Sequence, residues 1–105
     1  MKEIKNDDLK SLVSNKDKIW LLEFYNTHCP GCIKLEGTLK SLKEKLNGTV
    51  IIARANVEEN TQLVNNFGVR SCPTLLIFEK GKVQNMLTGS VSEKTILSAL
   101  RGEED

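Results

Sequence analysis

Several features that mark other classes of protein are missing from this sequence of 105 residues. Basic and acidic residues nearly balance, 15 against 14, which leaves no electrostatic footprint for nucleic acid or an anionic membrane. No apolar run approaches the length of a membrane span, and residues 1–8 lack the apolar core of a signal peptide. We therefore expect a single domain over residues 1–105, located in the cytoplasm, with neither nucleic acid nor membrane as a partner.

Cysteine, proline and histidine are scarce. Three cysteines are too few for a disulfide scaffold, and in an unexported chain they are more often catalytic or metal-binding than structural. The chain has two prolines, Pro30 and Pro73, and each directly follows a cysteine, Cys29 and Cys72. Its one histidine, His28, directly precedes Cys29.

The stretch Cys29-Pro30-Gly31-Cys32 follows an apolar run and precedes leucines at helical spacing, at positions 35, 39, 42 and 46. The cysteine pair therefore lies where a buried strand leads into a helix, with Pro30 at the first helical position. A thiol at a helix N-terminus faces unpaired N–H groups and the positive end of the helix dipole, and both favour the thiolate. We expect Cys29 to be the activated sulfur and Cys32 its partner in a reversible dithiol–disulfide switch.

Hydrophobic periodicity and cap residues predict the surrounding elements. Residues 18–25 are nearly continuous in apolar residues, which is typical of a strand covered on both faces. Glu23 interrupts this run, and a buried carboxylate is costly unless it is paired or neutral. Further strands are expected over residues 2–5, 50–56, 74–78 and 82–88. Helices are expected from Asn6, whose amide would cap the first, over 30–46, over 61–67 with Asn60 as the cap, and after a capping box at 90–93. The order β-α-β-α-β-α-β-β-α predicts an α/β fold with a central mixed sheet and helices on both faces.

This order, with a C-x-x-C at a strand–helix junction and Pro-Thr before a hairpin, resembles thioredoxin over nearly the whole chain. Four positions agree with the family. Glu23 stands where the family has a buried acid, usually aspartate, and Arg54 where it has a lysine near that acid. Pro73 matches the family's cis-proline, and Gly89 matches a glycine that lines the peptide-binding groove.

The resemblance implies a thiol–disulfide oxidoreductase that reduces protein disulfides, with Cys29 attacking and Cys32 resolving the mixed disulfide. It implies that Glu23, with Arg54, relays protons to or from Cys32; the alternative is a structural ion pair between the two side chains. The redox-active disulfide would be the working group, without a separate cofactor or metal. The expected partners are disulfide-containing proteins and an upstream flavoenzyme like thioredoxin reductase, with the chain itself a monomer.

Two departures from the family leave alternatives open. His28 replaces a tryptophan, so it either stabilises the Cys29 thiolate as a cation or only takes over a docking position. Cys72 replaces an isoleucine or threonine, and it is a small packing residue, a third redox sulfur or a ligand in a Cys₃His zinc site. The alternative functions are a more oxidising enzyme like glutaredoxin or an isomerase, and a metal-binding or redox-sensing module. By resemblance, a substrate's backbone would dock at His28, Pro30, Gly31, Cys72, Pro73 and Gly89.

Overall fold

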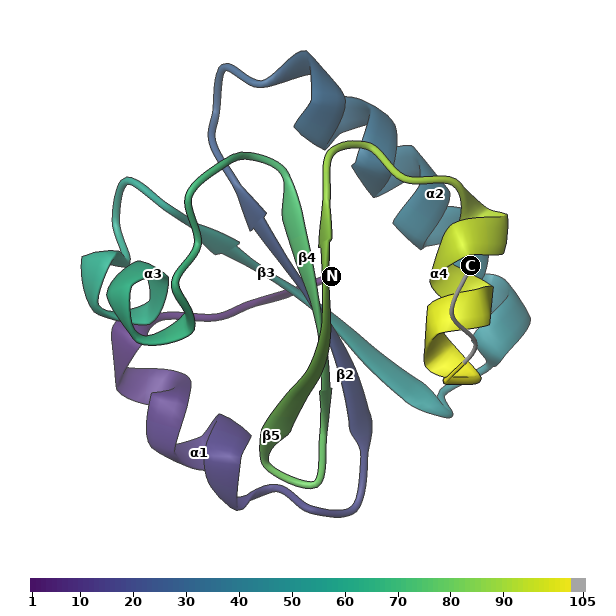
Figure 1. The fold of residues 1–105 in the computed structure, drawn as a ribbon, viewed down its shortest axis with the longest axis horizontal. Coiled ribbons are helices and arrows are strands. Elements are labelled where there is room, and N and C mark those ends of the chain that lie inside the picture. Colours follow the sequence, from purple (N-terminus) through teal and green to yellow (C-terminus); the bar gives the residue numbers. More distant parts are fainter. Residues whose placement is uncertain (103–105) are drawn as a thin grey trace.

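The computed structural model describes residues 1–102, so the last three residues of the expected domain lie outside the described part. The fold is built around one mixed β-sheet (Figure 1). Its five strands lie in the order β1-β3-β2-β4-β5. β1 and β2 run parallel to β3, whereas β4 runs antiparallel to β2 and β5 antiparallel to β4. The strands are β1 (Lys2–Glu3), β2 (Ile19–Tyr25), β3 (Val50–Asn56), β4 (Thr74–Glu79) and β5 (Lys82–Thr88). The mixed sheet and the expected order of elements are confirmed.

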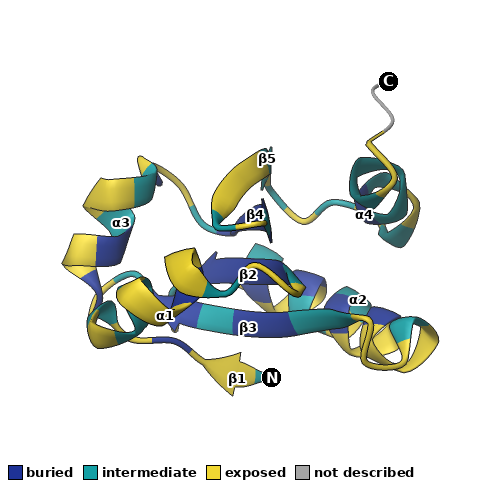
Figure 2. Ribbon diagram, turned by 90° about the horizontal axis from the view of Figure 1, so that it is seen from below, coloured by how far each residue is buried: buried dark blue, intermediate teal, exposed yellow. Residues whose placement is uncertain are grey.

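Helices cover both faces of this sheet, as the sequence predicts. They are η1 (Asn6–Asp8), a 3₁₀ turn, and the α-helices α1 (Leu9–Ser14), α2 (Pro30–Leu46), α3 (Thr61–Phe67) and α4 (Glu93–Leu100). Helices α1 and α3 lie on one side, and α2 and α4 on the other (Figures 1 and 2). Within residues 1–102, no helix is both long and apolar enough to cross a membrane.

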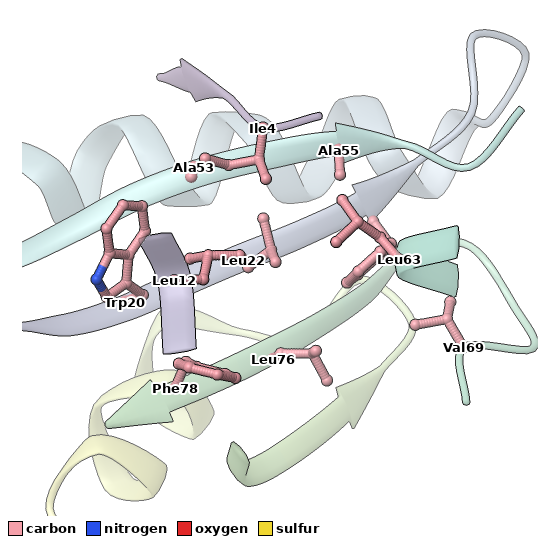
Figure 3. Packing of buried hydrophobic residues seen from close by; sticks show 11 residues of the cluster. Ile4, Leu12, Trp20, Leu22, Ala53, Ala55, Leu63, Val69, Leu76 and Phe78 are labelled. Atoms are coloured by element: carbon pink, nitrogen blue, oxygen red, sulfur yellow. The ribbon is translucent and has the colours of Figure 1, made fainter. Parts of the chain in front are cut away.

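The face under α1 and α3 is rich in aromatic rings (Figure 3). Strand β2 contributes Trp20 and Phe24 to it, because alternate residues of a strand point to the same side. The ring of Phe67 from α3 packs edge-on against those of Phe24 and Phe78, with centroids 6.2 and 5.6 Å apart. This cluster fixes α3, and with it the loop that leads to Cys72, against the sheet.

The face under α2 and α4 is built from leucine and isoleucine. The predicted leucine stripe of α2 lies here, with Leu35, Leu39 and Leu42 fully buried. Leu21 of β2 faces the same cluster, and so does the next alternate residue of the strand, Glu23. The strand is therefore covered on both sides, and its one carboxylate points toward the helix that begins at the dithiol.

Three predicted helix caps are corrected by the structure. The last helix is capped by Ser92, whose Oγ accepts the N–H of Thr95 at 3.1 Å, and not by Ser90. Residues before Ser92 still belong to the turn in which the Val91 N–H binds the Gly89 carbonyl. The first helix is not capped by the amide of Asn6.

Asn6 instead caps a helix far along the chain. Its Oδ1 accepts the N–H of Leu63 in α3 at 3.1 Å, while its own N–H donates to Oδ1 of Asn60 at 2.9 Å. The Asn60 side chain in turn donates to the carbonyl of Asn56. The Asn60 side chain is occupied by these bonds and does not cap α3, so Asn6 supplies the capping hydrogen bond to this helix.

Candidate active site

The cysteine pair lies at the junction of β2 and α2, where the sequence places it. Cys29 is the N-cap residue of α2, and its Sγ accepts the N–H of Cys32 at 3.1 Å. Pro30 occupies the first helical position, so no N–H is lost there. The two cysteines form a disulfide with Cα atoms 5.2 Å apart. Cys29 is half-buried and Cys32 is 1% exposed, so an incoming disulfide reaches Cys29 first.

A turn containing a cis peptide bond between Cys72 and Pro73 packs against this junction. A Cβ atom placed on Gly31 would lie only 3.2 Å from Cδ of Pro73, so the two backbones approach closely. The N–H of Gly89, at the end of β5, donates to the Pro73 carbonyl at 2.9 Å. The structure thus brings together Gly31, Pro73 and Gly89, three residues that the sequence assigns to substrate docking, and it confirms the cis-proline.

Cys72 is partly exposed and takes part in no disulfide within residues 1–102. Burial raises the pKa of its thiol, and the nearby Glu23 and Glu58 carboxylates raise it further. A cavity of about 400 Å³ lies beside it, lined by Asn26, Val57, Val64, Val69, Arg70, Ser71 and Cys72. These surroundings favour the thiol over the thiolate.

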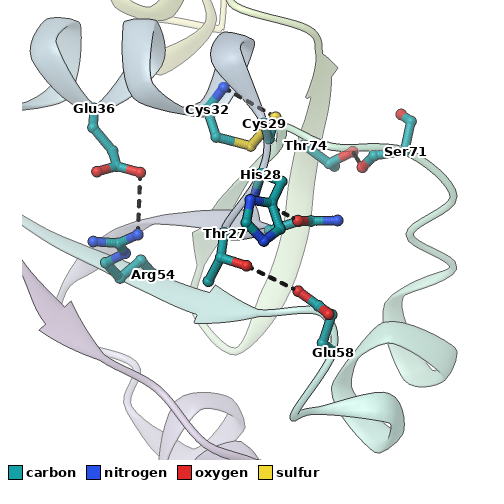
Figure 4. The surroundings of a disulfide bond; sticks show 10 residues. Thr27, His28, Cys29, Cys32, Glu36, Arg54, Glu58, Ser71 and Thr74 are labelled. Carbon is teal, nitrogen blue, oxygen red and sulfur yellow. Dashed lines mark hydrogen bonds and ion pairs between the residues drawn. A yellow bond between two sulfur atoms is a disulfide. The ribbon is translucent and has the colours of Figure 1, made fainter.

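The neighbourhood of His28 is polar and open to solvent. His28 is exposed on the loop before the disulfide, and its backbone N–H donates to Oδ1 of Asn26 at 2.9 Å. The hydroxyl of Thr27 donates to a Glu58 carboxylate oxygen at 3.4 Å (Figure 4). In the part of the chain that the structure describes, no three His, Cys, Asp or Glu side chains gather closely enough to hold a metal ion.

Glu23 is fully buried in the centre of the sheet. Neither of its carboxylate oxygens has a hydrogen-bond partner among residues 1–102. Burial, the chief cause, raises its pKa from 4.5 to about 8; Glu36 and Glu3 raise it further, and Arg54 opposes them. A carboxyl with this pKa holds or releases a proton near neutral pH, as a general acid or base must.

The ion pair between Glu23 and Arg54 that the sequence allows as an alternative does not form. The two residues are register partners on β2 and β3, but Arg54 Nη2 binds Oε2 of Glu36 at 3.1 Å (Figure 4). Its Nε lies 3.9 Å from a Glu3 oxygen, and its guanidinium stacks 3.6 Å above the Tyr25 ring. In this position the guanidinium is still partly exposed and has two carboxylate partners. A pairing with the fully buried Glu23 would remove it from water and leave it with one partner.

The sequence analysis missed Glu36 and Glu3, the two residues that hold Arg54. Glu36 follows Cys32 by four positions, so both lie on the same side of α2, and this spacing was the available signal. Glu3 carries no such signal, because only the pairing of β1 with β3 places it beside Arg54. Glu3 also accepts the Tyr25 hydroxyl at 2.9 Å.

Known proteins resemble this chain over nearly its full length. The thioredoxin family model matches residues 1–102. Thioredoxin 2 of Chlorobaculum tepidum is 32% identical over 93% of this chain and 90% of its own, and thioredoxin of Chlorobaculum thiosulfatiphilum is 31% identical over 90% and 87%. Protein disulfide-isomerase A6 of Mesocricetus auratus is 31% identical over 91% of this chain and 23% of its own length.

Proposed function

Since the chain belongs to the thioredoxin family and is a thiol–disulfide oxidoreductase, we propose that it reduces disulfides in protein substrates through Cys29 and Cys32. One observation supports these roles above the others. Cys29 caps α2 with its sulfur against a backbone N–H, and Cys32 is buried directly behind it. The N–H and the helix dipole stabilise a thiolate on Cys29, while burial keeps Cys32 protonated until it is needed.

In the first step the Cys29 thiolate attacks one sulfur of the substrate disulfide. The substrate S–S bond breaks, its second sulfur leaves as a thiolate and takes a proton from water, and Cys29 becomes joined to the substrate in a mixed disulfide. Gly31, which lies in the same helical turn as Cys29, approaches the backbone of Pro73, and Pro73 in turn binds Gly89; we assign this closely packed backbone to docking of an extended substrate segment. His28, Pro30 and Cys72 complete the proposed docking surface.

In the second step Cys32 attacks the sulfur of Cys29, the mixed disulfide breaks, and the substrate sulfur leaves as a thiolate that takes a proton from water. Cys32 must first lose its proton, and we assign Glu23 as the acceptor because it faces α2 and has a pKa of about 8. Arg54 would tune the acidity of Glu23. The products are a Cys29–Cys32 disulfide and two substrate thiols.

The enzyme then needs two electrons from another protein. Members of this family act on disulfide substrates and are reduced by thioredoxin reductase, and we propose a flavoenzyme of that kind as the electron donor. The redox-active group in this scheme is the cysteine pair itself. A cytoplasmic location, one domain over residues 1–105 and a monomeric state complete the proposal.

Single cysteine variants test the two roles. With dithiothreitol as electron donor and a disulfide-linked protein as substrate, C29S should lose all turnover, because no other sulfur is placed to attack. C32S should attack once and stall as a mixed disulfide that mass spectrometry locates on Cys29. Turnover retained in C29S, or a mixed disulfide located on Cys72, contradicts the assignment.

A more oxidising, isomerase-like function is the second candidate. It is favoured by the similarity to protein disulfide-isomerase A6 and by His28 beside Cys29. Equilibration with defined glutathione mixtures separates the two: a reductase keeps its pair oxidised until glutathione is almost fully reduced, whereas an isomerase-like pair is reduced readily. The metal-holding alternative is tested by the zinc content of protein purified under reducing conditions.

A further inference from the structure

The Glu36 side chain links the helix that carries the dithiol to strand β3. Glu36 lies one helical turn after Cys32, and Figure 4 shows its carboxylate directed at the Arg54 guanidinium. The 3.1 Å contact is a charge-assisted hydrogen bond, and both side chains are mostly buried, 20% and 24% exposed. Such a bond holds the guanidinium more firmly than an exposed ion pair does.

Without Glu36, Arg54 would face the unpartnered carboxylate of Glu23 on the neighbouring strand. The two are register partners on adjacent strands and point to the same face of the sheet. Facing side chains on neighbouring strands lie about 5 Å apart at Cβ, well within the reach of an arginine. Yet both oxygens of Glu23 are without a hydrogen bond among the described residues, because the guanidinium is turned toward Glu36, Glu3 and Tyr25.

We propose that Glu36 is a positioning residue of the dithiol exchange: it holds the Arg54 guanidinium against α2 and so leaves the Glu23 carboxyl without a counter-ion. Glu23 can then exchange a proton with Cys32 instead of remaining locked as a carboxylate. The inference rests on the proposed function, since it explains how the proton acceptor of the second step is kept ready.

The charged groups that act on Glu23 come from three elements packed against it: Glu36 on α2, Arg54 on β3 and Glu3 on β1. The Glu23 carboxylate in turn raises the pKa of the Cys72 thiol in the turn before β4. Arg54 is the one cation among the charges that act on Glu23 within the described residues. Its position therefore decides whether this carboxyl has a counter-ion.

A double-mutant cycle on the oxidised protein tests the proposal. In that form Cys29 and Cys32 do not titrate, so the pKa of Glu23 can be followed alone by NMR of ¹³C-labelled glutamate carboxyls. E36M removes the partner of Arg54 while keeping a side chain of similar length. The freed guanidinium should approach Glu23 and lower its pKa by about 1–3 units.

The second arm repeats E36M in an R54M background. If Glu36 acts by holding Arg54, the decrease there should be less than half as large. Equal decreases in both backgrounds would show that Glu36 acts only through its own charge, and they would overturn the proposal, as would an unchanged pKa in E36M. E44M, at an exposed glutamate of the same helix, is the matched control and should leave the pKa of Glu23 unchanged.

Kinetics supply the functional readout. In E36M the pH dependence of the resolving step should move to lower pH by the same number of units as the pKa of Glu23, because that step needs Glu23 unprotonated. The NMR measurement uses no substrate and no electron donor. It therefore stands or falls independently of the reductase assignment, which the cysteine variants test.

Discussion

The two faces of the sheet share the same strands but differ in what they bury. On the α1 and α3 face, β2 contributes Trp20, Leu22 and Phe24 to a cluster with several aromatic rings. On the α2 and α4 face, the same strand contributes Leu21 to a cluster of leucine and isoleucine, and the next residue of the strand on that side is the buried Glu23. The first face buries mainly apolar side chains, and its one side-chain group without a hydrogen-bond partner among residues 1–102 is the neutral indole N–H of Trp20, whereas the second contains a carboxyl group without a partner.

The α1 and α3 face mainly stabilises the fold, whereas the α2 and α4 face contains the group that we assign to proton transfer. Apolar burial on the α1 and α3 face stabilises the fold and positions the loop to Cys72. A buried carboxyl without partners destabilises the folded state when it is charged, and such groups persist where the chemistry needs them. The α2 and α4 face therefore gives up some stability at Glu23.

The largest effect should come from emptying the aromatic face. Phe24→Ala should lower the free energy of unfolding by about 3–5 kcal/mol, because it leaves a cavity where the rings of Phe67 and Phe78 pack. Urea unfolding of the oxidised protein at pH 7 measures this. The control is I33A at a side chain that is 69% exposed, which should change stability by less than about 0.5 kcal/mol. A loss below about 1 kcal/mol for F24A would mean that this face does not hold the fold.

A smaller effect, with a pH dependence of its own, should come from the charged face. The pKa of Glu23 is raised from 4.5 to about 8 on folding, so between these values the folded protein binds more protons than the unfolded chain. Proton binding by Glu23 therefore favours the folded state fully below pH 4.5, and this contribution is lost as pH rises through 8. The free energy of unfolding should fall by about 3 kcal/mol between pH 5 and pH 8. The wild type should lose this much relative to E23Q in urea unfolding of the oxidised protein across that range. Parallel curves for the two proteins would contradict it.

The sequence predicts the site well where the signal is local. The apolar run of β2, the leucine stripe of α2 and Pro30 after Cys29 place the dithiol at a helix N-terminus, and the structure has it there. These features depend on residues close together in the sequence and on the hydrophobic periodicities of helices and strands. The same local signals, found along the rest of the chain, predict the order of the elements.

The electrostatics of the site could not be predicted in the same way. Whether Arg54 pairs with Glu23 or with Glu36 depends on how α2 lies over β3, and both pairings satisfy the sequence equally. The cap of α3 shows the same limit, since Asn6 reaches Leu63 across 57 positions. Side-chain partners between elements are set by tertiary packing, on which periodicity carries no information.

The smallest effect should come from Cys72, which lies beside Val64 of α3 and Val69 of the loop that follows it. Its cavity contains Val57, Val64 and Val69, and burial raises the pKa of its thiol, in contrast to Cys29 at the positive end of a helix. C72S should therefore keep the rate of substrate reduction within about twofold. In the oxidised protein iodoacetamide should label Cys72 slowly, and faster only as pH rises above the ordinary thiol range, while reduced Cys29 reacts at neutral pH. Rapid labelling of Cys72 at pH 7, or a large loss of turnover in C72S, would make it a third redox sulfur and move part of the chemistry to the α3 side of the sheet.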